Sequence, residues 1–322
     1  MADGPLLAVE DVALAFADGR RRVQALDGVS LEVRRGEVLG VVGESGSGKS
    51  TLGRVMLRLL APDRGRVTFD RADARAFAGG ALRRFRRRVQ VVFQDNEASL
   101  DPRLTVGRTV GEGLAIHGIG TAAERRRRVA AVLTRVGLGP DFAARHPHTL
   151  SGGQRQRVNI ARALVLEPEL LIADEPVAAL DASMQAQILD LLAELERELG
   201  LTMVFISHDL AVVRAISDRV AVMYGGRLSE VGPTERVFTA PRHPYTAMLR
   251  ASIPEPDPAR TLRPPPSVPT ASGADHGGCV FAARCPLVIE ACRRAPPALT
   301  SVAGDHAAAC IRHHDVAHAF EP

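Results

Sequence analysis

Two long segments near the N-terminus alternate apolar and polar residues, a pattern typical of half-buried strands. They cover residues 6–16 and 23–34, and a turn around Gly19 separates them. This arrangement predicts an antiparallel pair of strands. A short apolar run follows at 37–42 and predicts a buried strand.

Helical spacing begins at Lys49. It continues to Leu60 and stops before Pro62, which predicts one helix. Another buried strand is predicted at 89–93. The stretch 105–165 has helical periodicity and no convincing strand.

The second half of the chain alternates strands with helices. The predicted elements are strand 169–174, helix 182–199, strand 202–206, helix 209–217, strand 219–223 and, after a glycine turn, a short strand at 227–231. Such alternation predicts an α/β fold with a parallel sheet covered by helices.

Composition places the chain among ordinary globular proteins. Its 322 residues are 46% hydrophobic and 24% charged, and the net charge of +4 is too small to demand a nucleic-acid partner. No run approaches the roughly 18 apolar residues of a membrane-spanning helix, and the N-terminus does not resemble a secretory signal. We therefore expect a cytoplasmic protein which, if it serves a membrane, does so as a peripheral subunit.

The character of the chain changes after residue 253. Seven prolines follow, at positions 254, 256, 258, 264, 265, 266 and 269, and they predict an extended linker over 254–272. The last segment, 273–322, contains all four cysteines. The sequence has no internal repeat and predicts one large domain over 1–253, with a helical subdomain at about 95–165, followed by a small C-terminal extension.

A phosphate-binding motif connects the strand at 37–42 to the helix after it. Residues 43–50 read GESGSGKS and match G-x-x-x-x-G-K-[ST] completely. The glycines let the backbone curl so that its N–H groups, together with the helix N-terminus, point at phosphate oxygens. We expect this loop to bind a nucleotide through Gly43, Ser45, Gly46, Ser47 and Gly48.

The first residues of the helix complete the motif. Lys49 is expected to reach the β- and γ-phosphates, Ser50 to bind Mg²⁺ through its hydroxyl, and Thr51 to hydrogen-bond a phosphate. Lys49 is also the only lysine, beside 40 arginines. Because the sequence uses arginine elsewhere, this position indicates a requirement for a compact ammonium that fits between phosphate oxygens.

Two adjacent carboxylates end the buried strand LLIADE at 170–175. Asp174 is expected to hold Mg²⁺, directly or through water. Glu175 is expected to orient or deprotonate the water that attacks the γ-phosphate, the task that phosphoryl transfer requires of a base.

The sequence LSGGQ at 150–154 lies between the two halves of this site. A phosphate loop, LSGGQ and then DEP, in this order, resemble the ABC ATPase family over about residues 6–250. The resemblance implies a P-loop NTPase cassette with a RecA-like parallel core, an antiparallel β subdomain and a helical signature subdomain. It also implies ATP hydrolysis, with ATP and Mg²⁺ bound.

The resemblance implies roles for three more residues near the nucleotide. Gln94, in VVFQD, would contact Mg²⁺ and link the site to membrane subunits. His208, in ISHD, would touch the γ-phosphate. Phe16, at the end of the first strand, would stack on adenine, the alternative being that it is a core residue.

The signature implies a second cassette. By resemblance, it would bind the γ-phosphate of the partner cassette's ATP, and Asp181, in AALD, would couple the two sites. Two cassettes stacked head to tail would close over two ATP molecules and transmit this motion to two membrane permease subunits. The signature residues concerned are Ser151, Gly152, Gly153 and Gln154.

Further stretches resemble the ATPases of the dipeptide, oligopeptide and nickel importers. They include FQDNEASLDPRLTV, ALDASMQAQILDLL and HPYT at 243–246. The chain departs from that group at Asn96 and Glu97, where Pro-Tyr is usual, and at Ala179, where Ser is common. The resemblance implies a peripheral ATPase on the cytoplasmic face of the membrane that drives import of di- or oligopeptides, with a solute-binding protein acting indirectly.

Other interpretations remain open. Nickel or another small solute is an alternative cargo, because other subunits select the cargo. A soluble ABC ATPase acting on ribosomes or DNA is disfavoured by the single cassette without long insertions. The HPYT segment argues against an exporter, and Glu175 and His208 argue against a non-catalytic cassette.

The four cysteines of the extension form a C-x5-C-x6-C-x17-C pattern. Disulfides are disfavoured in the cytoplasm, so four thiols this close suggest a metal centre. Zinc sites favour shorter C-x2-4-C spacings, whereas an iron–sulfur cluster accepts looser ones. Similar extensions of peptide-importer ATPases carry a [4Fe–4S] cluster in some members. We favour such a cluster over zinc or unligated thiols, with Cys279, Cys285, Cys292 and Cys310 as its ligands.

Overall fold

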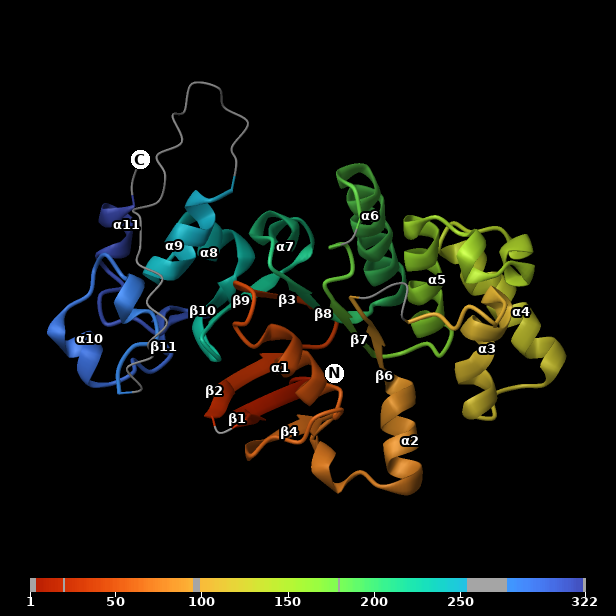
Figure 1. Cartoon of the computed structure of the whole chain (residues 1–322), viewed down its shortest axis with the longest axis horizontal. Coiled ribbons are helices and arrows are strands. Elements are labelled where there is room, and N and C mark those ends of the chain that lie inside the picture. Colours follow the sequence, from red (N-terminus) through yellow and green to blue (C-terminus); the bar gives the residue numbers. More distant parts are fainter. Residues whose placement is uncertain (1–3, 20, 95–98, 179, 254–276, 321–322) are drawn as a thin grey trace.

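The computed structural model describes residues 4–19, 21–94, 99–178, 180–253 and 277–320. Two β-sheets form the middle of the molecule (Figure 1). The helical segment 106–164 lies at one end of the long axis, and residues 277–320 lie at the other. The central sheet, whose strands hold the predicted phosphate loop and acidic pair, is thus flanked by two peripheral segments.

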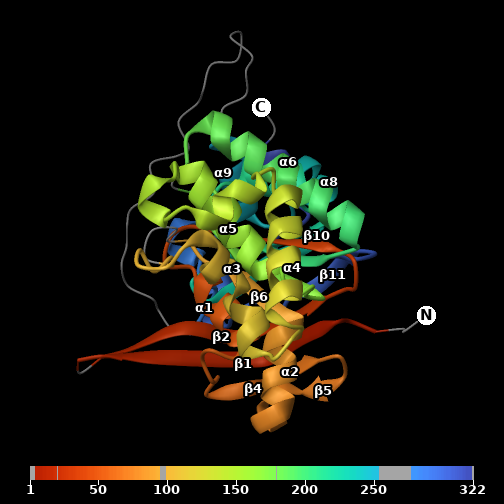
Figure 2. The ribbon, with the colours of Figure 1, turned by 90° about the vertical axis from the view of Figure 1, so that its right-hand side faces the viewer.

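The smaller sheet is antiparallel and lies in the lower part of the molecule in Figure 2. Its strands, in spatial order, are β2 (Arg21–Val33), β1 (Leu7–Asp18), β4 (Arg64–Phe69) and β5 (Ala72–Asp73). Leu7 pairs with Val33 at one end of the first hairpin. The predicted antiparallel pair is thus confirmed, whereas β4 and β5 were not predicted.

The larger sheet has a parallel centre. Its five parallel strands are β9 (Arg219–Tyr224), β3 (Val38–Val42), β8 (Thr202–Ser207), β7 (Leu170–Asp174) and β6 (Val89–Val92), in this spatial order. Every residue of β3, β7 and β8 is buried. This arrangement confirms the predicted α/β fold, because strands covered on both faces carry continuous apolar runs.

Helices cover both faces of this sheet. Leu39 and Val41 of β3 face a core shared with the antiparallel sheet and α1 (Lys49–Met56). Val38 and Val42 face a second core. The helices on that side are α6 (Ala182–Leu199), α7 (Leu210–Ile216), α8 (Thr234–Thr239) and α9 (Pro244–Ala251) (Figure 1).

The helical segment contains no strand among its described residues, as expected. It consists of α3 (Val106–Ile116), α4 (Ala122–Arg135) and α5 (Gly152–Leu164), with short 3-10 turns at Pro140–Ala144 and Pro147–Thr149. The N-terminus of α4 is a capping box in which Thr121 and Glu124 bond each other's backbone N–H groups. The segment packs on the central sheet through α5, which contacts β6 and α6.

The helix that starts at Lys49 is shorter than predicted, because it ends at Met56 and not at Leu60. Arg58 has a left-handed φ of 56°, which ends the helical path. Its guanidinium donates to the carbonyl oxygens of Arg75 and Phe77, outside the helix. Arg75 lies in a short 3-10 turn (Ala74–Ala76) and Phe77 directly follows it, before α2 (Gly79–Arg88).

The C-terminal extension continues the central sheet. Strand β10 (Arg227–Pro233) pairs antiparallel with β9 on one side and with β12 (His306–Ala308) on the other, and β11 (Thr300–Ala303) follows. Two short helices, α10 (Glu290–Arg294) and α11 (Val316–Ala319), complete the extension. The linker predicted at 254–272 lies outside the described residues.

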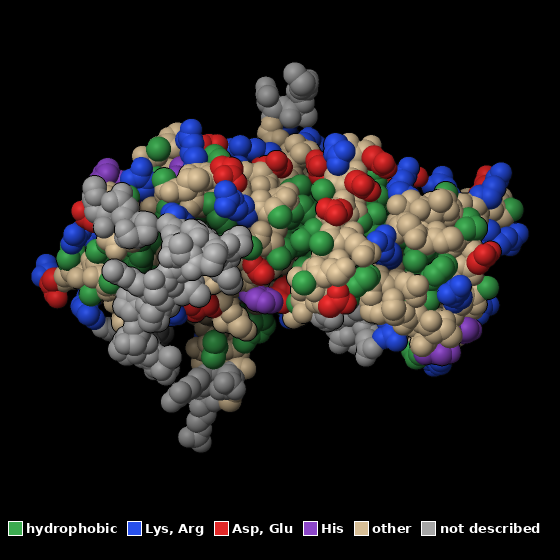
Figure 3. All heavy atoms as spheres, turned by 90° about the horizontal axis from the view of Figure 1, so that it is seen from above, with side chains coloured by type: hydrophobic (Ala, Val, Ile, Leu, Met, Phe, Trp, Pro, Cys, Tyr) green, Lys and Arg blue, Asp and Glu red, His purple; other side chains and the backbone are tan. Residues whose placement is uncertain are grey.

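No helix within the described ranges is long and apolar enough to cross a membrane. Acidic and basic side chains are interspersed over the face shown in Figure 3.

A buried carboxylate ties the extension to the cassette. Glu230 on β10 is fully buried, and its two oxygens accept hydrogen bonds from the backbone N–H groups of Arg242 (2.7 Å) and His243 (3.0 Å). Nε2 of His306 on β12 lies 2.6 Å from Oε1 of Glu230. One side chain therefore fixes both the start of α9 and the strand contributed by the extension.

We expect Glu230→Ala to lower the free energy of unfolding by about 3–5 kcal/mol, because it leaves two backbone donors and a buried imidazole without an acceptor. Urea unfolding of the full chain measures this change. Glu235→Ala is the control: Glu235 pairs with Arg214 on the surface, so its loss should cost less than about 1 kcal/mol. Equal losses in the two variants would contradict the role given to Glu230.

Candidate functional site

The phosphate loop runs from the carboxyl end of β3 to the first turn of α1, and neighbouring strands fix its path. Gly48 has φ 101°, and a Cβ there would lie 2.5 Å from the carbonyl oxygen of Ala25 in β2. A Cβ on Gly43 would lie 2.2 Å from the carbonyl oxygen of Met223 in β9. Only glycine fits these contacts. The loop is therefore held in place, and no described side chain caps the N-terminus of α1 that follows it.

Lys49 is held over this loop. Its side chain is buried, and Nζ donates to the carbonyl oxygens of Gly43 (2.7 Å) and Glu44 (2.9 Å). Burial lowers the pKa of Lys49, while attraction to Glu175, Asp174 and Glu44 acts in the opposite direction. The ammonium group of Lys49 thus lies directly against the backbone of the phosphate loop, where it can meet the phosphates that this motif binds.

Ser50 and Asp174 form the adjoining part of the site. The Ser50 hydroxyl donates to Oδ1 of Asp174, at the end of β7, with an Oγ–Oδ1 distance of 2.9 Å. Burial raises the pKa of Asp174, and the bond from Ser50 partly offsets this effect. A hydroxyl and a carboxylate side by side are oxygen ligands of the kind that Mg²⁺ prefers, so the residues present fit that ion.

Glu175 has a strained backbone and a carboxylate held from two sides. Its φ is 47°, a left-handed value that is unfavourable for a glutamate, and its N–H donates to the carbonyl oxygen of Ile206 (2.9 Å). Oε2 accepts from Nε2 of Gln94 (3.0 Å) and lies 3.2 Å from Nδ1 of His208. The structure therefore brings together three residues that the sequence placed on separate segments.

Other residues of the predicted site vary in exposure. Ser45 and Gly46 are exposed and Thr51 is half-buried. Ser47 is buried, and within the described part of the chain its hydroxyl has no hydrogen-bond partner, so this loop contains an unpaired buried polar group. The ring of Phe16 is 41% exposed on β1, which does not fit the alternative that it is a core residue.

The LSGGQ signature forms the N-terminus of α5. Ser151 caps this helix by accepting from the N–H of Gln154, whose amide oxygen accepts from the N–H of Ser151 (3.1 Å). Gly152 is exposed. A Cβ on Gly153 would meet the methyl end of Met184 at 1.8 Å, so α5 packs closely on α6 here.

Asp181 caps α6 in the same way, by accepting from the N–H of Met184 (2.9 Å). Among the described residues, no hydrogen bond or ion pair joins the signature to the chain's own phosphate loop, and the two lie on different parts of the molecule (Figure 1). The departures noted at Asn96, Glu97 and Ala179 lie outside the described residues.

One contact of the phosphate loop was not predicted from the sequence. The hydroxyl oxygen of Tyr245, on α9, accepts from the N–H of Glu44 at 2.8 Å. Glu44 occupies an unspecified position of the phosphate motif, and Tyr245 was used only as part of the HPYT segment. No local signal could relate two residues 201 positions apart.

The four cysteines line one small cavity, together with Phe281, Ile311 and Arg312. All four thiols are free. Burial, with a smaller contribution from the neighbouring cysteines, raises the pKa of Cys279, that of Cys285 to about 11 and that of Cys310 to about 12. Among the described residues, however, no group of three or more His, Cys, Asp or Glu side chains is placed to hold a metal ion. The structure thus gives four neighbouring thiols and does not support the predicted cluster.

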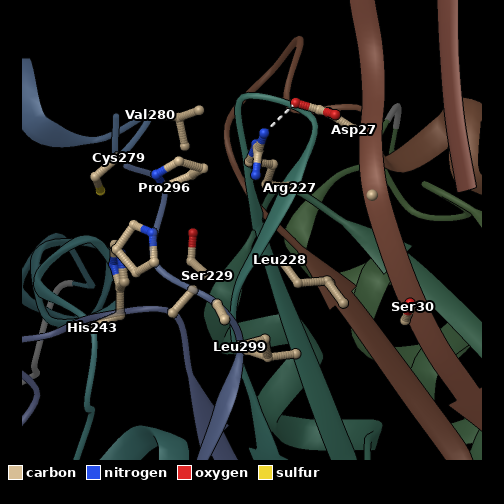
Figure 4. Close-up of a pocket in the computed structure, with 14 residues that line it drawn as sticks. Asp27, Ser30, Arg227, Leu228, Ser229, His243, Cys279, Val280, Pro296 and Leu299 are labelled. Atoms are coloured by element: carbon tan, nitrogen blue, oxygen red, sulfur yellow. Dashed lines mark hydrogen bonds and ion pairs between the residues drawn. The ribbon is translucent and has the colours of Figure 1, made fainter. Parts of the chain in front are cut away.

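A larger cavity of about 340 Å³ adjoins these cysteines, between β2, β10 and the extension. Cys279 and His243 line both cavities. Figure 4 shows Asp27 and Arg227 paired across one side of it, with Ser229 and His243 on the other. Burial lowers the pKa of His243 to about 3, so this imidazole is neutral at physiological pH.

Comparison with known families gives two matches. Residues 26–178 match the family described as ABC transporter. Residues 229–292 match the family described as oligopeptide/dipeptide transporter, C-terminal region. The first match includes the phosphate loop, the signature, Asp174 and Glu175, and the second includes three of the four cysteines. Other residues of the predicted site lie outside both matches, namely Phe16, Asp181, His208 and Cys310.

Relatives resemble the chain over nearly its whole length. A Brucella ovis protein named as a peptide import ATP-binding protein is 50% identical over 320 residues, which are 97% of this chain and 99% of the relative. A Bacillus subtilis protein named as an oligopeptide transport ATP-binding protein is 45% identical over 95% of each chain. A glutathione import ATP-binding protein of Pectobacterium atrosepticum is 53% identical over 76% of this chain and 39% of its own length.

Solved structures share the fold. A protein from Clostridium perfringens, part of an ABC transporter complex, has a TM-score of 0.65 and 34% identity, covering 73% of this chain and 91% of its own. A dimeric ATP-binding cassette bound to ADP and Pi has a TM-score of 0.64 and 33% identity, covering 71% of this chain and 98% of its own.

We expect Gly48→Ala to destabilise the nucleotide-free protein more than Gly46→Ala. Both glycines have positive φ, but a Cβ at Gly46 meets nothing within 4 Å. The strain alone should cost about 1–2 kcal/mol at either position, and the clash with the carbonyl of Ala25 should add about 1–3 kcal/mol at Gly48. Urea unfolding without nucleotide measures the difference, and equal losses would show that β2 does not fix the loop.

Proposed function

This chain belongs to the ABC transporter ATPases, in the group of the peptide-import ATP-binding proteins, and we propose that its ATP hydrolysis drives the uptake of di- or oligopeptides. The observation that carries the catalytic part is the carboxylate of Glu175, held between Gln94 and His208 and adjacent in sequence to Asp174, which accepts from Ser50. In this proposal a base, a metal-binding pair and a phosphate loop lie together at one edge of the sheet.

We propose the following roles for these residues. The loop N–H groups and Lys49 bind the phosphates, and Phe16 stacks on the adenine. Ser50, Asp174 and Gln94 hold Mg²⁺, which neutralises phosphate charge when it is bound. Glu175 accepts a proton from the attacking water while the bond between the γ-phosphorus and its bridging oxygen breaks, and His208 contacts the γ-phosphate.

A second cassette is required to complete the site. In this proposal the signature serves the partner's ATP through Ser151, Gly152, Gly153 and Gln154. The exposure of Ser151 and Gly152, and the separation of this helix end from the chain's own phosphate loop, support it. Asp181 couples the two sites. Closing and reopening of the dimer drives two membrane permease subunits, with the chain bound peripherally on the cytoplasmic face.

Peptides are the proposed cargo because relatives at 50% and 45% identity are named for peptide import and oligopeptide transport, and because the second family match is to peptide transporters. A solute-binding protein delivers the cargo to the permease. Nickel or another small solute is the alternative, since this subunit does not contact the cargo. The family assignment disfavours a soluble, non-transport ATPase.

We also propose that Cys279, Cys285, Cys292 and Cys310 bind a [4Fe–4S] cluster. The support is that all four free thiols line one cavity and that their spacing is looser than that of common zinc sites. Binding would require the thiols to lose their protons and draw closer, because they are not placed as metal ligands in the structure. Zinc and unligated thiols are the alternatives.

We expect Glu175→Gln to reduce ATP turnover of the purified protein by about 10²–10⁴-fold while ATP binding persists, because the amide cannot accept the proton from water. In cells that rely on this transporter, uptake of a labelled dipeptide should stop as well. Glu194→Gln, on the exposed side of α6, is the control. Turnover that survives in Glu175→Gln would show that Glu175 is not the base. Uptake of nickel, and not of the dipeptide, by the wild-type transporter would show that the alternative cargo is the correct one.

Protein purified without oxygen is expected to be brown, with absorbance at about 400 nm and about four iron atoms per chain. Cys292→Ser, which changes the most buried of the four thiols, should lose this absorbance. A colourless preparation with stoichiometric zinc would favour the zinc alternative, and one with neither metal would leave the thiols unligated.

A further inference from the structure

The extension contacts the phosphate loop directly through Arg284. Its guanidinium forms two hydrogen bonds to the carboxylate of Glu44, from Nη1 to Oε2 at 2.7 Å and from Nη2 to Oε1 at 3.0 Å. Such a two-point pair fixes orientation as well as charge. The pair links residues 240 positions apart.

Aromatic rings hold Arg284 in this position. Its guanidinium lies 5.6 Å from the ring centroid of Tyr224 and 5.8 Å from that of Phe281, and Nη1 donates to the Tyr224 hydroxyl at 3.3 Å. The Phe281 ring meets Tyr224 edge-on at 5.2 Å and is buried. Tyr245, the acceptor of the Glu44 N–H, packs against both rings. The backbone N–H of Glu44 is therefore bonded to one ring of an aromatic cluster, and its carboxylate is bonded to the arginine that packs on the same cluster.

Arg284 also belongs to a turn that lies between two of the cysteines, Cys279 and Cys285. It ends the 3-10 turn Ala282–Arg284, and Cys285 follows it. The N–H of Ala282 donates to the carbonyl oxygen of Cys279 (2.9 Å), and the N–H of Cys279 donates to that of Cys292 (2.7 Å). The position of the guanidinium thus depends on the fold of the cysteine segment.

Glu44 in turn contacts the lysine that meets the phosphates. Its carbonyl oxygen accepts from Nζ of Lys49 at 2.9 Å, and also from the N–H of Ser47 at 3.1 Å. A free carboxylate on this loop would repel the phosphates of ATP. Arg284 compensates that charge and restrains the backbone to which Lys49 is bonded.

We propose that Arg284 is a positioning residue for ATP binding, through which the cysteine-bearing extension holds the phosphate loop by Glu44. The extension is then part of the nucleotide site, although it need not touch the nucleotide. This inference does not depend on the nature of the cargo or on the metal content of the extension.

The test is equilibrium binding of Mg-ATP to the purified full-length chain. Arg284→Met keeps the length of the side chain and removes its charge and donors. It should weaken ATP binding about three- to tenfold, as expected for loss of a partly exposed two-point pair. Arg294→Met is the matched control, because Arg294 is an exposed arginine of the same extension that faces Glu290, and its ATP affinity should equal that of the wild type.

Glu44→Gln distinguishes positioning from general loss of structure. Arg284 restrains the loop only through this carboxylate, so Glu44→Gln should itself weaken ATP binding, by about two- to fivefold. Its loss should be smaller than that of Arg284→Met, because the charge that repels the phosphates is removed as well. In the double variant, Arg284→Met should then cost less than about twofold. If Arg284→Met alone binds ATP normally, or if its loss persists undiminished beside Glu44→Gln, the proposal is wrong.

Arg284→Lys provides a second measurement if Arg284→Met does not fold. Lysine keeps the charge but cannot span both carboxylate oxygens. We expect at least about a twofold loss of ATP affinity and faster amide hydrogen exchange over residues 44–48. No change in either would overturn the proposal. Failure of the wild-type chain to bind ATP would instead reject the nucleotide site itself, so the two failures are distinguishable.

Discussion

Parallel pairing of β3, β8 and β7 is the constraint on which the site depends. Val42 of β3 lies opposite Ser207 of β8, and Asp174 of β7 lies opposite Ile206. Parallel strands end at the same edge of a sheet, so the segments that follow them meet there. The phosphate loop, Glu175 and His208 are those segments. A shift of one residue in this register would turn the side chains to the opposite face and separate the groups that now converge.

Most charges at this edge have a partner. Lys49 stands among carboxylates, the Ser50 hydroxyl bonds Asp174, and the carboxylate of Glu175 lies between an amide and an imidazole. In a partly buried site such contacts keep each group in one orientation before the substrate arrives. The strained backbone of Glu175 is stabilised by its bond to β8, so the cost of its unusual conformation is met by the sheet.

The sequence predicted the parts of the site that consist of local motifs. It predicted less well the features that depend on contacts between distant residues. The loop at 43–50, the acidic pair after β7 and the strand–helix alternation all have fixed spacings that identify them. Helix α1 ended early because Arg58 bonds to carbonyl groups of a turn some 17 to 19 residues away, which periodicity does not register. The Arg284–Glu44 pair joins residues that are 240 positions apart, and no motif specifies either of them. The cysteine pattern predicted four metal ligands. In the structure the four cysteines line one cavity, but the described residues do not have the geometry of a metal site.

The pairing of β12 with β10 has a consequence for how the chain may be divided. Without β11 and β12, β10 would be an edge strand with unpaired N–H and C=O groups, and its side chains are mostly buried in the complete chain. Such an edge is a template on which other chains add strands and aggregate. The four-residue β11, with exposed Thr300 and Ser301, forms a short and polar border instead. In this protein the extension therefore protects the edge of the sheet from pairing with other chains. A cassette produced alone, by cutting the chain near residue 253, would expose that edge.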